Sequence, residues 1–104
     1  MPIKVMVVDD SAVVRGLVTR TLQEDPDIEV VASASNGRMA LMQLERKPEV
    51  EIVILDIEMP VMDGLTALPL LIAQRPGLKV IMASTLTLRN ADISLQALHA
   101  GGID

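Results

Sequence analysis

Strand-like and helix-like segments alternate along the whole chain. An apolar, β-branched run over Ile3–Val8 stops abruptly at Asp9, and valine and leucine then recur at helical spacing from Val13 to Leu22. The same alternation repeats three more times. We predict further strands over Ile28–Ala34, residues 50–55 and residues 78–83, and further helices around residues 40–44, 65–72 and 91–98.

The predicted strands are too evenly apolar to leave one face of a sheet in water. Four strand–helix units with short links therefore predict a parallel sheet with helices on both faces. No internal repeat beyond this alternation, low-complexity segment or linker divides the chain. The prediction is one α/β domain over residues 1–104 with a doubly wound, flavodoxin-like parallel sheet.

The third helix contains a proline whose place depends on where that helix begins. With Asp63 as the N-cap, Pro69 falls in the helix interior, at a cost of about 3 kcal/mol, and kinks it. With Thr66 as the N-cap, Pro69 falls in the first turn, where proline is tolerated. The pattern leaves both alternatives open. Gly101-Gly102 is expected to end the fourth helix.

Composition excludes several classes of function. Among 104 residues, half are apolar and none is Cys, Phe, Tyr or Trp, which rules out disulfides, thiolate chemistry and base stacking. The net charge is −5 and the basic residues are scattered, so nucleic acid is not expected as a direct ligand. The apolar runs are too short for a transmembrane span and no signal peptide is apparent, so we expect a cytoplasmic protein without membrane insertion.

Polar residues follow three of the predicted strands directly. Open parallel sheets bind ligands beyond the carboxyl ends of their strands. Asp9 and Asp10 follow the first strand, Asp56 the third and Ser84 the fourth. Clustered carboxylates repel one another unless a cation or a proton is shared. Oxygen ligands alone favour a hard ion, so the sequence predicts a Mg²⁺ site at this edge.

Each of these residues also has an ordinary structural explanation. Asp10 or Ser11 suits a helix N-cap, and a single Asp at the end of a strand, such as Asp56, is a common turn residue. The conjunction of Asp56 with Asp9 and Asp10 favours the functional interpretation. His99 is interpreted as a residue near a helix end without a functional role. Asp63-Gly64 is interpreted as a turn and helix cap, and residues 24–29 as a solvated acidic loop.

Three blocks of sequence carry a resemblance to a known family. Residues 5–11 read VMVVDDS, residues 54–64 read ILDIEMPVMDG, and residues 82–84 read MAS. Their order and spacing resemble the response-regulator receiver domain of two-component signalling. Residues 56–60 together with residues 84–87 more closely resemble the N-terminal receiver of the chemotaxis protein-glutamate methylesterases.

This resemblance implies a role for each matching residue. Asp56 would be the phosphoacceptor, a nucleophile that takes a phosphoryl group from a histidine kinase. Asp10, Asp56 and the backbone carbonyl of Glu58 would bind Mg²⁺, and Asp9 would act largely through water. The Ser84 hydroxyl would bond a phosphoryl oxygen, which biases a loop between two states. In the methylesterase family this change relieves inhibition of a C-terminal catalytic domain, whereas the present residues are expected to form the receiver and no enzyme.

The chain also departs from the family pattern. Receivers have five strand–helix units, the fifth strand ending in a Lys that pairs with the phosphoryl group, and only four units are found in these 104 residues. Lys4 and Lys79 are predicted at the opposite edge of the sheet and Lys47 at the end of the second helix, so phosphate sensing is expected to be impaired. An exposed edge strand and a bare sheet face favour pairing. We therefore expect self-association, as a homodimer.

Two other functions compete with the receiver interpretation. A Mg²⁺-dependent phosphohydrolase of the haloacid-dehalogenase type also uses an Asp nucleophile in an α/β fold. That class spaces its first two aspartates two residues apart, whereas Asp9 and Asp10 are adjacent. The second competitor is a dimerising module that works without phosphorylation, and its association would not respond to Mg²⁺.

Overall fold

The structure, a computed structural model, describes residues 1–83. Its elements follow the predicted alternation of strands and helices. In chain order they are β1 (Ile3–Val8), α1 (Ala12–Gln23), β2 (Ile28–Ala34), α2 (Gly37–Arg46), β3 (Ile52–Asp56), α3 (Gly64–Gln74) and β4 (Lys79–Ala83). The predicted fourth helix, Ser84, His99 and Gly101-Gly102 lie outside the described residues.

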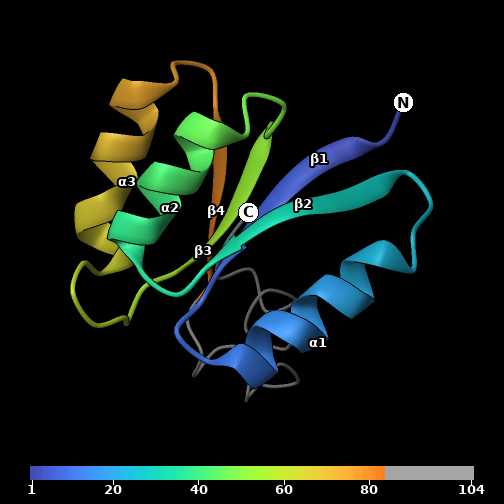
Figure 1. Ribbon diagram of the computed structural model, residues 1–104, viewed down its shortest axis with the longest axis horizontal. Coiled ribbons are helices and arrows are strands. Elements are labelled where there is room, and N and C mark those ends of the chain that lie inside the picture. Colours follow the sequence, from blue (N-terminus) through green and yellow to red (C-terminus); the bar gives the residue numbers. More distant parts are fainter. Residues whose placement is uncertain (84–104) are drawn as a thin grey trace, which may run out of the picture.

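The four strands form one parallel sheet in the order β2-β1-β3-β4. Helix α1 lies on one face, and α2 and α3 lie side by side on the other (Figure 1). The chain therefore reverses its winding direction between β1 and β3, which makes their carboxyl ends the switch point of the sheet. The predicted doubly wound α/β fold is confirmed.

The main core lies between the sheet and the α2–α3 layer. It includes Met6, Leu44, Val53, Leu55 and Leu71, each with no exposed surface. Successive side chains of a strand point to opposite faces, and both faces of the central strand β1 are buried over residues 5–8. Its continuous apolar run is what burial under helices on both sides requires.

Two strands begin later than predicted, and local turns explain why. β3 starts at Ile52 rather than at Val50, because the Val50 backbone N–H donates to the Lys47 carbonyl in a turn, at 3.2 Å. β4 starts at Lys79, because the Leu78 N–H likewise donates to the Arg75 carbonyl, at 3.1 Å. Both Val50 and Leu78 are nevertheless buried, so their apolar character reflects the core and not a ladder position.

The position of Pro69 is now decided. Asp63 is the N-cap of α3, and its side-chain oxygen accepts from the Thr66 N–H at 2.8 Å. Pro69 therefore lies inside the helix, where its missing N–H removes one backbone hydrogen bond. Of the two alternatives, the interior position is correct.

Candidate functional site: an acidic cluster at the switch point

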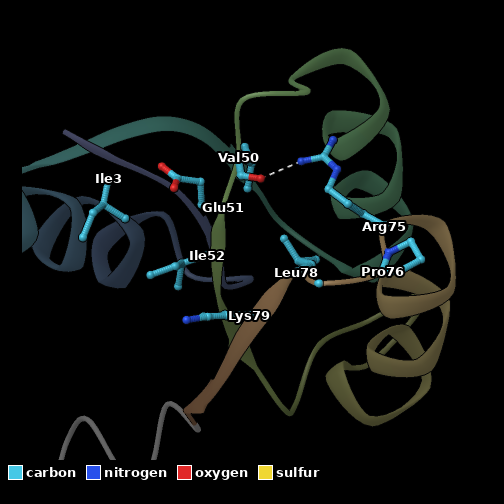
Figure 2. Close-up of a pocket in the computed structure, with 9 residues that line it drawn as sticks. Ile3, Val50, Glu51, Ile52, Arg75, Pro76, Leu78 and Lys79 are labelled. Carbon is cyan, nitrogen blue, oxygen red and sulfur yellow. Dashed lines mark hydrogen bonds between the residues drawn. The ribbon is translucent and has the colours of Figure 1, made fainter. Parts of the chain in front are cut away.

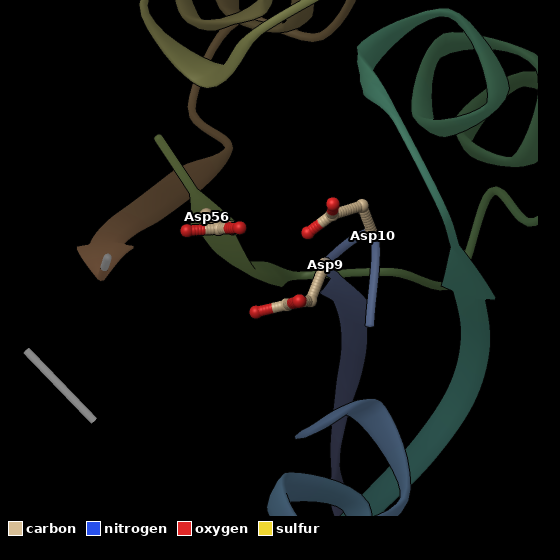
Figure 3. Close-up of side chains that lie close together, drawn as sticks. All are labelled: Asp9, Asp10 and Asp56. Atoms are coloured by element: carbon tan, nitrogen blue, oxygen red, sulfur yellow. The ribbon is translucent and has the colours of Figure 1, made fainter. Parts of the chain in front are cut away.

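Strand register brings the candidate carboxylates together. Val8 pairs with Leu55 in the β1–β3 ladder, so the next residue of each strand, Asp9 and Asp56, stand side by side. Asp9 is 3% exposed and Asp56 is 2% exposed, while Asp10 is open to solvent. One carboxylate oxygen from each of Asp9, Asp10 and Asp56 lies within 4.8 Å of the others (Figure 3). The structure thus assembles the three aspartates that the sequence singled out.

The arrangement places like charges at short range. At an effective dielectric of 20, two carboxylates about 4.8 Å apart repel by roughly 3.5 kcal/mol. The cluster therefore favours a cation that binds all three groups. Carboxylate oxygens are the donors that Mg²⁺ and Ca²⁺ select, so the residues present fit a hard divalent ion.

The turn that carries Asp9 and Asp10 is held on several sides. The Asp9 backbone N–H donates to the Ala34 carbonyl at 3.0 Å, and the Asp9 side chain accepts from the Ser11 N–H at 2.8 Å. The Arg15 guanidinium donates to the Asp9 carbonyl at 2.7 Å. Ser11 caps α1 by accepting from the Val14 N–H at 3.2 Å, which leaves Asp10 without the capping role considered for it.

The loop after β3 is equally constrained. Gly64 lies so close to β3 that a Cβ there would be 2.1 Å from the Asp56 carbonyl oxygen, and its N–H donates to the Ile57 carbonyl at 2.8 Å. Only glycine fits this position. Asp63 caps α3, which confirms the turn-and-cap interpretation. Hydrogen bonds from the Thr66 N–H and hydroxyl hold the pKa of the Asp63 carboxyl below its ordinary range.

Several predicted residues lie apart from the cluster. Glu58 is exposed in the loop after β3, and its side chain is not among the clustered carboxylates. Lys4 is the second residue of β1 and Lys79 the first of β4, so both lie at the opposite edge as expected, and Lys47 is the C-cap of α2. Of the acidic stretch 24–29, Glu29 belongs to β2 and pairs with Lys4.

A hollow of about 420 Å³ lies at the amino edge of the sheet, away from the cluster (Figure 2). Arg75 lines it and donates to the carbonyls of Val50 at 2.6 Å, Leu44 at 2.7 Å and Lys47 at 3.3 Å. These bonds tie α3 to the end of α2. The guanidinium therefore serves to hold the fold together. Ligands of open α/β sheets bind at the other edge, so this hollow is not the candidate site.

Comparison with known proteins identifies the family of the chain. The family described as response regulator receiver domain matches residues 5–104. The chain belongs to this family. No helix among the described residues has the length and apolarity needed to span a membrane.

Individual proteins agree with this assignment. The chain is 70% identical over 100 residues to the protein-glutamate methylesterase/protein-glutamine glutaminase 1 of Rhodospirillum rubrum, covering 96% of the chain and 26% of that protein. It therefore spans about a quarter of the length of this relative. The present chain forms a receiver domain, and the hydrolase activity belongs to the name of the longer relative.

Two solved structures show the same kind of fold. A CheX–CheY complex with BeF3 and Mg²⁺ from Borrelia burgdorferi matches with 29% identity and a TM-score of 0.77, covering 97% of this chain and 74% of that one. CheY6 of R. sphaeroides, solved with the P1 domain of CheA3, matches with 38% identity and a TM-score of 0.69, covering 96% and 77%.

Sequence reasoning missed three supporting residues. Arg15 donates to the Asp9 carbonyl and Arg75 to carbonyls far along the chain, and no sequence pattern marks either residue. Gly37 is the third, because its N–H donates to the Met62 carbonyl at 2.8 Å. The Asn36-Gly37 pair was the one available signal for it.

Proposed function

We propose that the chain is a phosphoacceptor in two-component signalling and that Asp56 takes the phosphoryl group. The observation that carries the proposal is the cluster of Asp9, Asp10 and Asp56 at the switch point of the sheet. Membership of the receiver family and the acidic donor set support it.

Asp56 is the proposed nucleophile. A carboxylate oxygen forms a bond to phosphorus while the P–N bond of a phosphohistidine breaks. The electron pair of that bond stays on the imidazole nitrogen, which then takes a proton from water. Burial of Asp56 at the end of β3 keeps bulk water away from its carboxyl group and so protects the acyl phosphate from hydrolysis.

Mg²⁺ is the proposed metal of the cluster. Asp10, Asp56 and the backbone carbonyl of Glu58 would bind it directly, and Asp9 largely through water. When bound, the ion offsets charge on the transferred phosphoryl group. The Mg²⁺ in the Borrelia burgdorferi CheY complex supports this choice. Ser84, whose hydroxyl is proposed to bond a phosphoryl oxygen, lies outside the described residues.

The proposed donor is a histidine kinase of chemotaxis signalling, in the cytoplasm. The R. sphaeroides CheY6 structure with the P1 domain of CheA3 supports this class of partner. The names of the longer relatives support a further step, in which the receiver controls a protein-glutamate methylesterase domain. Ester hydrolysis by the full-length gene product, with and without phosphorylation, tests that step, and a rate that ignores phosphorylation contradicts it.

The decisive experiment for the acceptor is intact mass spectrometry after incubation with a small acyl phosphate. Wild type should gain one phosphoryl group only when Mg²⁺ is present, and Asp56→Asn should gain none. Asp63→Asn is the matched control, because it removes a nearby carboxylate but keeps a good N-cap. An adduct that persists in Asp56→Asn, or none in a wild type folded by circular dichroism, would contradict the proposal.

Self-association as a homodimer stays a prediction. Val13 and Leu17 of α1 and Ile81 of β4 are more than half exposed, which is consistent with a surface that pairs. Light scattering over a range of concentrations measures the association. A monomer at every concentration contradicts the dimer, and a dimer that ignores both Mg²⁺ and phosphorylation favours the phosphorylation-independent module.

A further inference from the structure

The loop between β3 and α3 contains a strained turn. Val61 has a φ of 67°, and the Met62 N–H donates to the Pro60 carbonyl two residues back, at 2.7 Å. This is a γ-turn in its rare form, with a β-branched residue in left-handed backbone. The Val61 side chain is 76% exposed, so its own packing does not hold the turn.

Helix α2 supplies what holds it. The Gly37 N–H donates to the Met62 carbonyl at 2.8 Å, directly after the strained residue. Gly37 is the first residue of α2, where a backbone N–H has no partner within the helix and is free to bond elsewhere. The next cap bond of the helix is separate, because the Asn36 side chain accepts from the Met39 N–H.

The contact is close enough to require glycine. A Cβ on Gly37 would lie 2.7 Å from the Ala67 Cβ and 2.9 Å from both the Met62 carbonyl oxygen and the Met62 Cγ. By contrast, a Cβ on Gly16 of α1 would meet nothing within 4 Å. Any side chain at position 37 must therefore push the Met62 carbonyl away or separate α2 from α3.

We infer that Gly37 is a positioning residue for the phosphoacceptor loop: α2 clamps the strained turn at 60–62 and so holds residues 57–59, next to Asp56, in the geometry that binds metal. The inference rests on the proposed function, which assigns the Glu58 carbonyl to Mg²⁺. Strain of this kind persists only where the surroundings hold it. The Gly37–Met62 bond is such a constraint, and it comes from an element distant in sequence.

Amide hydrogen exchange of the metal-free wild type tests the clamp first. Exchange at Gly37 should be at least about fivefold slower than for an open first-turn amide, because the bond to Met62 must break. In Gly37→Ala, residues 57–63 should exchange faster, whereas the matched control Gly16→Ala should leave them unchanged. An unprotected Gly37 amide in the wild type overturns the inference, even if Gly37→Ala does not fold.

Calorimetric titration with Mg²⁺ then separates positioning from packing. Gly37→Ala should lose about tenfold in affinity, as expected for a residue that orients a metal ligand. The double variant Gly37→Ala/Ala67→Gly removes the clash with Ala67 but not the one with the Met62 carbonyl. Its thermal stability should recover in part while its Mg²⁺ affinity stays low, and recovery of both overturns the clamp.

The same titration keeps the two proposals distinguishable. A wild type that takes up no Mg²⁺ overturns the proposed function and the inference with it. A wild type that binds Mg²⁺ through Asp56, together with a Gly37→Ala that binds it equally well, overturns the clamp alone.

Discussion

The two edges of the sheet arrange their charged side chains in opposite ways. At the amino edge, charged side chains bond to groups of the fold: Lys4 pairs with Glu29, and Arg75 donates to three backbone carbonyls. At the carboxyl edge, three carboxylates lie within 4.8 Å of one another. Matched groups stabilise the fold by themselves, whereas like charges at short range favour an added cation.

The two edges also differ in backbone strain. The left-handed position at the amino edge is Gly77, with a φ of 93°, where glycine meets no steric cost. At the carboxyl edge it is Val61, for which this conformation is costly. Among the described residues, the amino edge is thus relaxed and the carboxyl edge is strained, as expected where structure is subordinate to a site.

Arg75→Met should produce the largest change in stability. It leaves the carbonyls of Leu44, Lys47 and Val50 without their charged donor, and the free energy of unfolding should fall by about 3 kcal/mol. Denaturant unfolding measures the loss. Mg²⁺ affinity of the folded fraction should be unchanged, and a change there would show that the two edges are coupled.

Asp10→Asn should act in the opposite direction. Removing one charge from the cluster should raise the unfolding free energy of the metal-free chain by about 1.5 kcal/mol, less than the full repulsion because Asp10 is exposed. It should also reduce the stabilisation that Mg²⁺ confers. The control Glu49→Gln makes the same charge change at an exposed site elsewhere. If both variants stabilise equally, overall charge and not the cluster is responsible.

Substitutions at the two left-handed positions should change the unfolding free energy by smaller amounts and in opposite directions. Gly77→Ala should lower the unfolding free energy by about 1 kcal/mol, because a Cβ is strained there even though space is open. Val61→Asn should raise it by about 1 kcal/mol, since Asn tolerates left-handed backbone. Thermal unfolding of both variants checks the pair, and a destabilised Val61→Asn would contradict the strain.

Asp63 should contribute the smallest effect, visible only in acid. Its folded-state pKa is lowered, so its contribution is present above the pKa of the unfolded chain and disappears as pH falls through the lower folded value. Asp63→Asn should remove that part of the acid dependence and leave stability near neutral pH almost unchanged. Unfolding curves at several pH values compare it with wild type, and identical acid dependence would contradict the assignment.

Much of this molecule could be predicted from local pattern. Periodicity identified the alternation of strands and helices, because burial on both faces of a parallel sheet requires continuous apolar runs. The aspartates after the first and third strands could be placed at one edge, because all strands of such a sheet run the same way. The start of β3 was missed since Val50 is apolar for the core and forms a turn instead.

Contacts between distant segments were beyond the reach of that pattern. Gly37 and Met62 are 25 residues apart along the chain by their numbers, and only the packing of α2 against α3 makes their bond possible. Arg75 could not be assigned to the carbonyls it binds for the same reason. The unequal burial of Asp9 and Asp10, adjacent in sequence, depends on which of them faces β3.

By itself, the sequence determined the fold class, the edge at which the acidic cluster lies and the residue types gathered there, because these follow from periodicity and from the direction of parallel strands. Only the tertiary structure decided the distances within the acidic cluster, the interior position of Pro69 and the hydrogen bond between Gly37 and Met62. Those features depend on strand register and helix packing, which are set by interactions summed over the whole domain.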